Sequence, residues 1–123
     1  MIIIQFLSYN FSFVQEFVGD PVDGVTLLLE LLRAVQLSQA SQQQRCPPQV
    51  LRRALLDEHS CLVCLKHCLR CPDASRRLAS SPAGLFTLAV CIMSNVTKSR
   101  IIALEVKFIL IVKIFYRQIN FVF

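Results

Sequence analysis

The chain has 123 residues, of which 54% are hydrophobic and 17% charged, and its formal net charge is +5. This length provides for one domain or for part of a larger one. The apolar content excludes a mainly disordered chain, and the low counts of 3 Gly and 5 Pro exclude collagen-like and low-complexity architectures.

The two ends of the chain differ in composition from its middle. All eight acidic residues lie within residues 13–105, whereas the last 18 residues hold three cations and no acid. Ile, Phe, Lys, Asn and Tyr, which have AT-rich codons, make up 12 of the last 18 residues and 7 of the first 12, but only 9 of the 93 between. We therefore distinguish an atypical N-terminal extension (1–12), a middle segment (13–105) and an atypical hydrophobic basic tail (106–123). The ends are interpreted as translated non-coding sequence, with a genuine hydrophobic tail as the alternative.

Neither end predicts a membrane span or secretion. The most apolar run, 101–116, contains Glu105, Lys107 and Lys113, and each such charge costs about 2.5–3.5 kcal/mol at the centre of a span. Residues 1–7 lack a basic region and are too short for a signal peptide. We therefore expect a cytoplasmic protein with reduced thiols and no membrane partner. Because the basic excess lies mostly in the tail, we expect no nucleic-acid partner.

The middle segment opens with two predicted helices. Apolar residues at 13, 14, 17 and 18 share one helical face, and the Gly-Asp-Pro sequence at 19–21 ends that helix. Asp20 or Asp23 is predicted to cap the next helix, with Pro21 in its first turn, and this helix runs to about Leu37.

The second helix is predicted to be buried on more than one side. An apolar stripe with the helical period is formed by Val25, Leu28, Leu29, Leu32 and either Val35 or Ala34. Leu27 and Leu31 widen this stripe. The next segment, Ser38–Pro48, is polar, lacks periodicity and ends in two prolines, so we predict a surface loop there.

The longest predicted helix follows this loop and spans about Gln49–Arg70, with Pro72 as its stop. Its apolar period is interrupted once, where Glu58 occupies a position that the pattern assigns to an apolar residue.

Capping residues predict three further helical segments. Asp73 caps a short turn through Ala79, Ser81 caps a helix over 82–93, and Thr97 caps a last helix that continues into the tail. Because no segment alternates polar and apolar residues, the predicted fold class is all-α. Several helices have wide apolar faces, which favours an armadillo-like helical repeat (α-solenoid) fragment as much as a closed bundle.

Four cysteines cluster near the end of the longest predicted helix. The spacing of Cys61, Cys64, Cys68 and Cys71 on its own is compatible with zinc or an iron–sulfur cluster. On one straight helix, however, they form a single stripe of about 15 Å, which is too long for one tetrahedral ion. We therefore predict that they pack in the core as small apolar side chains, with metal binding or redox sensing as alternatives.

No other motif predicts catalysis or a cofactor. With glycines only at 19, 24 and 84, a phosphate-binding glycine loop is excluded, and no nucleophile–base pattern is present. We therefore expect no enzyme activity, no cofactor and no metal. A moderately basic region is either a solvated helix face or a binding patch for an acidic partner. It comprises Arg52, Arg53, Lys66, Arg70, Arg76 and Arg77.

Five segments occur in an order that carries a family resemblance. They are Phe13–Val18, Gly24 with Leu27–Leu32, Leu56–Lys66, Ser81–Leu85 and Lys98–Glu105. In this order they resemble the start of the formin N-terminal regulatory domain, the GTPase-binding and diaphanous-inhibitory armadillo region. The resemblance covers 13–105, about three quarters of the chain, and rests on the ordered set rather than on any single motif.

The resemblance implies a partial armadillo-type regulatory domain of a large actin-assembly protein. Such a domain holds the formin C-terminal autoregulatory segment until an activated Rho-family GTPase releases it. Both are therefore implied partners, and actin is implied only indirectly. The implied role is autoinhibition of actin assembly in the cytoplasm, in association with the cytoskeleton, and no enzyme activity belongs to this region.

The implied partner surface lies at the end of the longest helix. Where diaphanous-type formins have an Asn-rich turn followed by Gly, this chain has Arg70, Cys71 and Ala74, so no GTPase-contact residue is matched. Lys66 and Arg70 are predicted to bind a partner because they end the helix that the family uses. The rival hypotheses are a cysteine-cluster metal or redox protein and a small membrane-associated protein anchored by its tail.

Overall fold

The computed structural model of the chain describes residues 11–42, 48–94 and 96–122. Within these ranges the chain forms helices and no strand, which confirms the predicted all-α class. The helices are α2 (Phe11–Val18), α3 (Gly24–Gln42), α4 (Pro48–Cys68), α5 (Pro72–Ala79), α6 (Pro82–Ile92) and α7 (Thr97–Val122).

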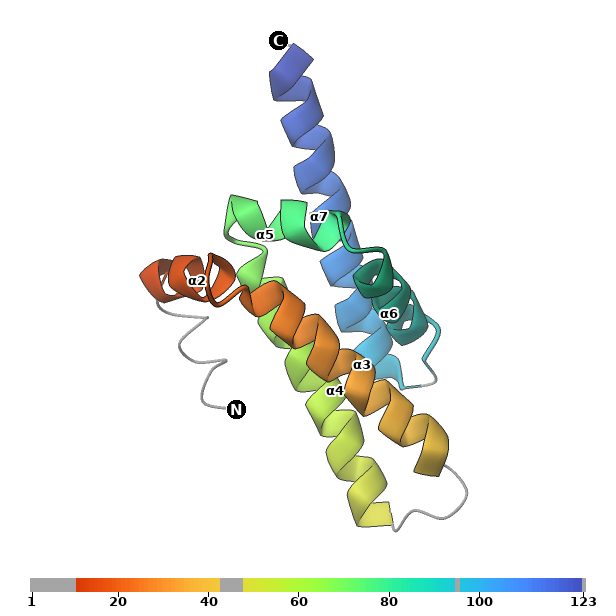
Figure 1. The fold of residues 1–123 in the computed structure, drawn as a ribbon. Helices are drawn as coiled ribbons and strands as arrows, with labels where there is room; N and C mark the ends of the chain where they lie inside the picture. The colour runs from red at the N-terminus through yellow and green to blue at the C-terminus, as the bar shows by residue number, and fades with distance from the viewer. Residues whose placement is uncertain (1–10, 43–47, 95, 123) are drawn as a thin grey trace.

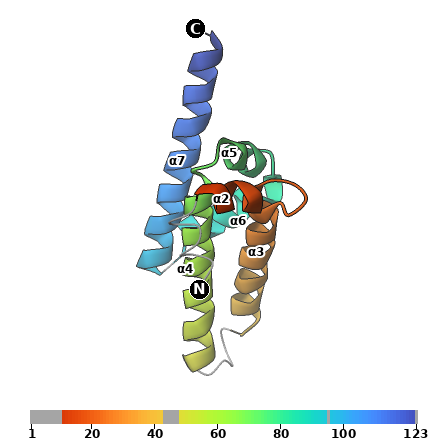
Figure 2. The ribbon, with the colours of Figure 1, turned by 90° about the vertical axis from the view of Figure 1, so that its left-hand side faces the viewer.

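The centre of the fold is the antiparallel pair of α3 and α4, which share the most extensive helix–helix contact (Figure 1). α7 runs along α4 in the same general direction, and α6 packs against both α7 and α3. The short helices α2 and α5 lie across one end of this group. The C-terminal part of α7 extends beyond the other helices in both views (Figures 1 and 2).

The stripe predicted for α3 faces the core. Its first four members are 0–6% exposed: Val25, Leu28, Leu29 and Leu32. At its end, Val35 is partly buried and Ala34 is exposed. Leu27 and Leu31, in contrast, are 50% and 45% exposed. The prediction that this helix is buried on more than one side was therefore wrong, because its neighbours among the described helices cover only one face.

Two glycines allow helices to approach closely. A Cβ at Gly24 would overlap the ring of Phe17, so the start of α3 lies directly against α2. A Cβ at Gly84 would lie 2.5 Å from Cδ1 of Leu29, so α6 approaches α3 more closely than a side chain there would allow. These glycines therefore set the spacing of α2 and α6 from α3.

The turn between α2 and α3 ends at Asp23, which caps α3 as predicted. The hydroxyl of Thr26 donates a hydrogen bond to Oδ2 of Asp23 at 2.8 Å. Burial alone would raise the pKa of Asp23, but hydrogen bonds from Thr26 and Arg77 outweigh it and hold this pKa below its ordinary value. Pro21 lies in the turn before α3, not in its first turn, so that detail of the prediction was wrong.

Arg77 of α5 connects this turn to the rest of the fold. Its guanidinium Nη1 is 3.2 Å from Oδ1 of Asp23 and 3.3 Å from Oδ1 of Asp20. Its Nε also donates to Oδ2 of Asp73 at 2.7 Å within α5. One half-buried cation therefore holds the α2–α3 turn against α5.

The prediction of a loop over Ser38–Pro48 was wrong for the first residues of that segment, because α3 continues to Gln42. Nε2 of Gln39 donates a hydrogen bond to Oε2 of Glu58, which is only 3% exposed. A buried carboxylate needs a polar partner, and glutamine is a good helix former, so the helix extends to provide one. Residues 43–47 lie outside the described residues, and Pro48 begins α4 instead of closing a loop.

The helix boundaries after the cysteine cluster also differ from prediction. α4 ends at Cys68 rather than Arg70, and Cys71 is the extended residue that precedes α5. Pro72 occupies the first position of α5, so Asp73 lies inside this helix and is not its cap. Ser81 does cap α6 as predicted, since its Oγ accepts a hydrogen bond from the backbone N–H of Gly84 at 3.1 Å.

α7 passes without a break through Glu105, where composition divides the middle segment from the tail. Val106 and Leu110, the first buried residues beyond this point, are 0% and 4% exposed and belong to the central core. The beginning of the tail therefore packs with the middle segment. Residues 1–10 of the N-terminal extension lie outside the described residues.

Candidate partner-binding surfaces and the cysteine cluster

Lys66 and Arg70 lie about one turn apart at the C-terminal end of α4. Nζ of Lys66 is 2.6 Å from Oε2 of Glu105, so this ion pair joins α4 to α7. The two side chains are 40% and 43% exposed, and such a pair contributes about 1 kcal/mol at most. Arg70 is exposed in the turn after α4, with its guanidinium carbon 5.8 Å from the centre of the Phe11 ring.

Two further cations of the basic region, Arg76 and Arg77, are partly neutralised by acids. Asp73 accepts hydrogen bonds from both Arg76 and Arg77. These bonds, with that from Arg77 the largest, hold the pKa of Asp73 below its ordinary value. The positive charge of Arg76 and Arg77 is therefore offset by acids from the same helix and from the α2–α3 turn.

The cysteine cluster is part of the core, as predicted. Cys61, Cys64 and Cys68 are 0% exposed, Cys71 is 6% exposed, and all are free thiols. Cys71 does not continue the stripe of α4, because the helix ends three residues earlier. In the part of the chain that the structure describes, no group of three or more His, Cys, Asp or Glu residues is placed to hold a metal ion.

Burial raises the pKa of four thiols, three in the cluster and one in α6. Desolvation raises the pKa of Cys61, Cys68 and Cys91 to about 12 and that of Cys64 to about 11. Because the thiolate is the nucleophile, we expect almost no reaction of these four cysteines with a thiol reagent at pH 8 until the chain is unfolded. Peptide mass spectrometry after labelling, with and without denaturant, checks this cysteine by cysteine. Rapid labelling of Cys64 in the folded chain would contradict it.

The same shifts predict a loss of stability in alkali. The thiols ionise near pH 9 in the unfolded chain but stay neutral when folded, so their contribution is complete below pH 9. It is lost progressively as the pH rises toward 12, which circular dichroism at several urea concentrations would follow. Replacement of the four cysteines by alanine should weaken the pH dependence of the free energy of unfolding above pH 9. If that pH dependence did not change, groups other than the thiols would cause it.

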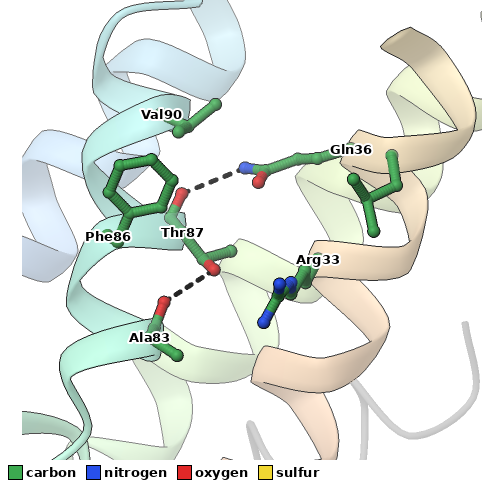
Figure 3. A pocket seen from close by; sticks show the side chains of 7 residues that line it. Arg33, Gln36, Ala83, Phe86, Thr87 and Val90 are labelled. Atoms are coloured by element: carbon green, nitrogen blue, oxygen red, sulfur yellow. Dashed lines mark hydrogen bonds between the residues drawn. The ribbon is translucent and has the colours of Figure 1, made fainter. Parts of the chain in front are cut away.

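An open groove with a volume of about 430 Å³ lies between α3 and α6 (Figure 3). It is lined by Arg33, Gln36, Leu37, Ala83, Phe86, Thr87 and Val90. The side-chain N–H of Gln36 donates to the carbonyl oxygen of Thr87 at 3.0 Å and also contacts Sγ of Cys91 at 2.9 Å. The Thr87 hydroxyl donates to the carbonyl of Ala83 at 2.8 Å. The polar groups of the groove floor thus bond to one another.

The walls of this groove are apolar and exposed. Phe86 is 71% exposed and Val90 41% on the α6 wall, and Leu37 is 61% exposed on the α3 wall. Met93, 84% exposed, continues the α6 row by another turn. Arg33 is the charged residue of the lining, which contains no acid or histidine. Such a surface can bind apolar side chains but has no groups for acid–base or nucleophilic chemistry.

The sequence pattern does not predict this groove. The spacing of Phe86, Val90 and Met93, four and three residues apart, is a signal that α6 has a second apolar face. Nothing in the spacing indicates that this face borders α3, because the two helices are about 50 residues apart in sequence. The pairing of the walls follows from the close approach at Gly84.

No protein-family model, curated protein or solved structure matches the chain. Among the described helices, none has both the length and the apolar content that crossing a bilayer requires. The structure itself thus defines an all-α protein with an open apolar groove.

Proposed function

We propose that the chain is a protein-interaction module, an armadillo-like helical fragment related to the formin regulatory domain, which binds the apolar face of a partner helix. The groove between α3 and α6 is the observation that carries this proposal. Its apolar side chains are exposed on both walls, while the polar groups of its floor are satisfied. An amphipathic helix can bury such walls without leaving a polar group unpaired.

The succession of helix pairs supports the armadillo-like part of the proposal. α3 and α4 form one pair and α6 and α7 the next, and each pair packs on the other. Stacked pairs of this kind form helical repeats, in which each unit covers a face of its neighbour.

In the proposed mechanism, the groove holds the formin C-terminal autoregulatory segment, and a Rho-family GTPase bound near Lys66 and Arg70 displaces it. The displacement requires only that each partner lowers the affinity of the chain for the other, which is a positive coupling free energy. Actin assembly is then inhibited while the segment is held and resumes when it is released. No catalytic step is proposed for the chain.

The test is binding of a fluorescent peptide with the sequence of a formin C-terminal autoregulatory segment, measured by anisotropy. Phe86→Asp should weaken binding at least about tenfold, since it places a charge in the apolar wall. Leu56→Ser is the matched control, because Leu56 is 60% exposed on α4 and does not line the groove. A GTP-loaded Rho-family GTPase should displace the peptide, and Arg70→Glu should reduce this displacement.

Two results would contradict this function. One is the absence of peptide binding by a chain that is helical by circular dichroism. The other is an equal loss of affinity in Phe86→Asp and Leu56→Ser, which would show that the peptide does not bind in the groove.

A further inference from the structure

The outer face of α7 carries a second apolar surface, separate from the groove. We define the α7 stripe as Ile101, Leu104, Phe108, Ile111 and Phe115. Their side chains are 47–68% exposed, so no other described helix covers them. Successive members are three, four, three and four residues apart, which is the heptad spacing of a helix–helix seam.

The face of α7 opposite to the stripe packs against the rest of the fold and fixes the position of the helix. It is almost fully buried against the rest of the fold through Ser99, Ala103, Val106 and Leu110. The C-terminal part of α7 extends past the other helices (Figures 1 and 2). A partner would therefore meet a helix that is already formed, which removes the cost of ordering it on binding.

The charges at the helical positions that border the stripe are three cations, Lys98, Arg100 and Lys107, and one acid, Glu105. α7 carries five cations, Lys98, Arg100, Lys107, Lys113 and Arg117, and a single acid, Glu105. That acid is already paired with Lys66, at 2.6 Å. Within the described residues, Lys98, Arg100 and Lys107 form no ion pair with an acidic side chain.

We propose that the α7 stripe binds an amphipathic helix of another protein, whose apolar seam is bordered by Asp and Glu residues. The heptad spacing provides the interlocking positions for such a helix, and the basic border selects its acidic flanks. A second copy of this chain would oppose basic borders to each other. A lipid surface would use the same apolar face and cations, so vesicle binding is one of the outcomes that the test below distinguishes.

The full chain can be tested with two synthetic helical peptides of about four heptads, both with Leu at the seam positions. One has Glu at the flanking positions and the other has Lys. We expect the Glu peptide to bind at least about tenfold more tightly than the Lys peptide, by anisotropy at low salt, with the difference shrinking as salt is added.

Single substitutions show where the peptide binds and separate a loss of binding from a loss of folding. Phe108→Ser should weaken binding of the Glu peptide at least about tenfold, whereas Leu56→Ser, equally exposed on α4, should leave it unchanged. Lys107→Glu should weaken the Glu peptide and strengthen the Lys peptide. A gain of affinity cannot come from a misfolded chain, so this charge exchange supports the proposal independently of stability.

Four outcomes would overturn the proposal. They are equal affinity for both peptides, no effect of Phe108→Ser, binding to phosphatidylserine vesicles without binding to the Glu peptide, and a dimer in sedimentation that Phe108→Ser dissociates. The third result would assign the stripe to a lipid surface and the fourth to a second copy. Phe86→Asp should not change binding of the Glu peptide, so this test is separate from that of the groove.

Discussion

A chain that ends at Glu105 is expected to lose its cooperative unfolding transition. The truncation removes Val106 and Leu110, which are 0% and 4% exposed in the central core. Loss of two such side chains removes about 3–6 kcal/mol of apolar burial, which approaches the entire stability of many small domains. What remains of α7, Thr97–Glu105, is also shorter than the roughly 12–15 residues that make an isolated helix even marginally stable. Thermal unfolding followed by circular dichroism and calorimetry provides the measurement.

The control is a chain that ends at Gln118, which keeps every buried residue of α7 named above. It should unfold cooperatively at nearly the temperature of the full chain. If the chain ending at Glu105 did the same, residues 13–105 would be an independent unit, and the compositional boundary would also be a structural one.

Adjacent leucines in α3 are expected to respond very differently to truncation. Leu32 is 0% exposed, so Leu32→Ala leaves a cavity and should lower the free energy of unfolding by about 2–5 kcal/mol. Leu31 is 45% exposed, so Leu31→Ala should cost less than about 1 kcal/mol. Both residues are in the same helix and undergo the same chemical change, so the difference reports burial alone.

Urea denaturation of the two variants measures this difference. The data are fitted with one shared value for the dependence of the free energy of unfolding on urea concentration. Equal losses would mean that Leu31 is also buried in solution, as the amphipathic pattern predicts for both positions. A common loss below 1 kcal/mol would instead mean that α3 does not pack on α4 as described.

Local patterns predicted much of the fold. The period of α3 identified its buried residues, and the cap at Ser81 placed the start of α6, because both depend on residues only a few positions apart. The prediction of a loop after Leu37 was wrong because the structure of that segment depends on a contact between residues that are far apart in the sequence. Gln39 remains helical beside Glu58, which is 19 residues away, and polar composition alone does not show this contact.

The candidate sites were predictable to different degrees. Burial of the cysteines followed from their position among leucines, whereas the partner of Lys66 did not, since Glu105 is 39 residues away. The groove needed two helices to meet at Gly84, and the sequence shows only one wall at a time. The proposed partner roles of Lys66 and Arg70 stay predictions that the binding experiments above would test.

The amino-acid sequence by itself determined that the chain is helical, where α6 begins, and that the cluster around Cys64 belongs to the core. These properties depend on periodicity and capping, which act over one or two turns of helix. Only the tertiary structure decided that Leu31 is exposed beside a buried Leu32, and that α7 buries one apolar face and exposes the other. Both faces of α7 are rich in apolar residues, and which face is covered depends on where the other helices lie.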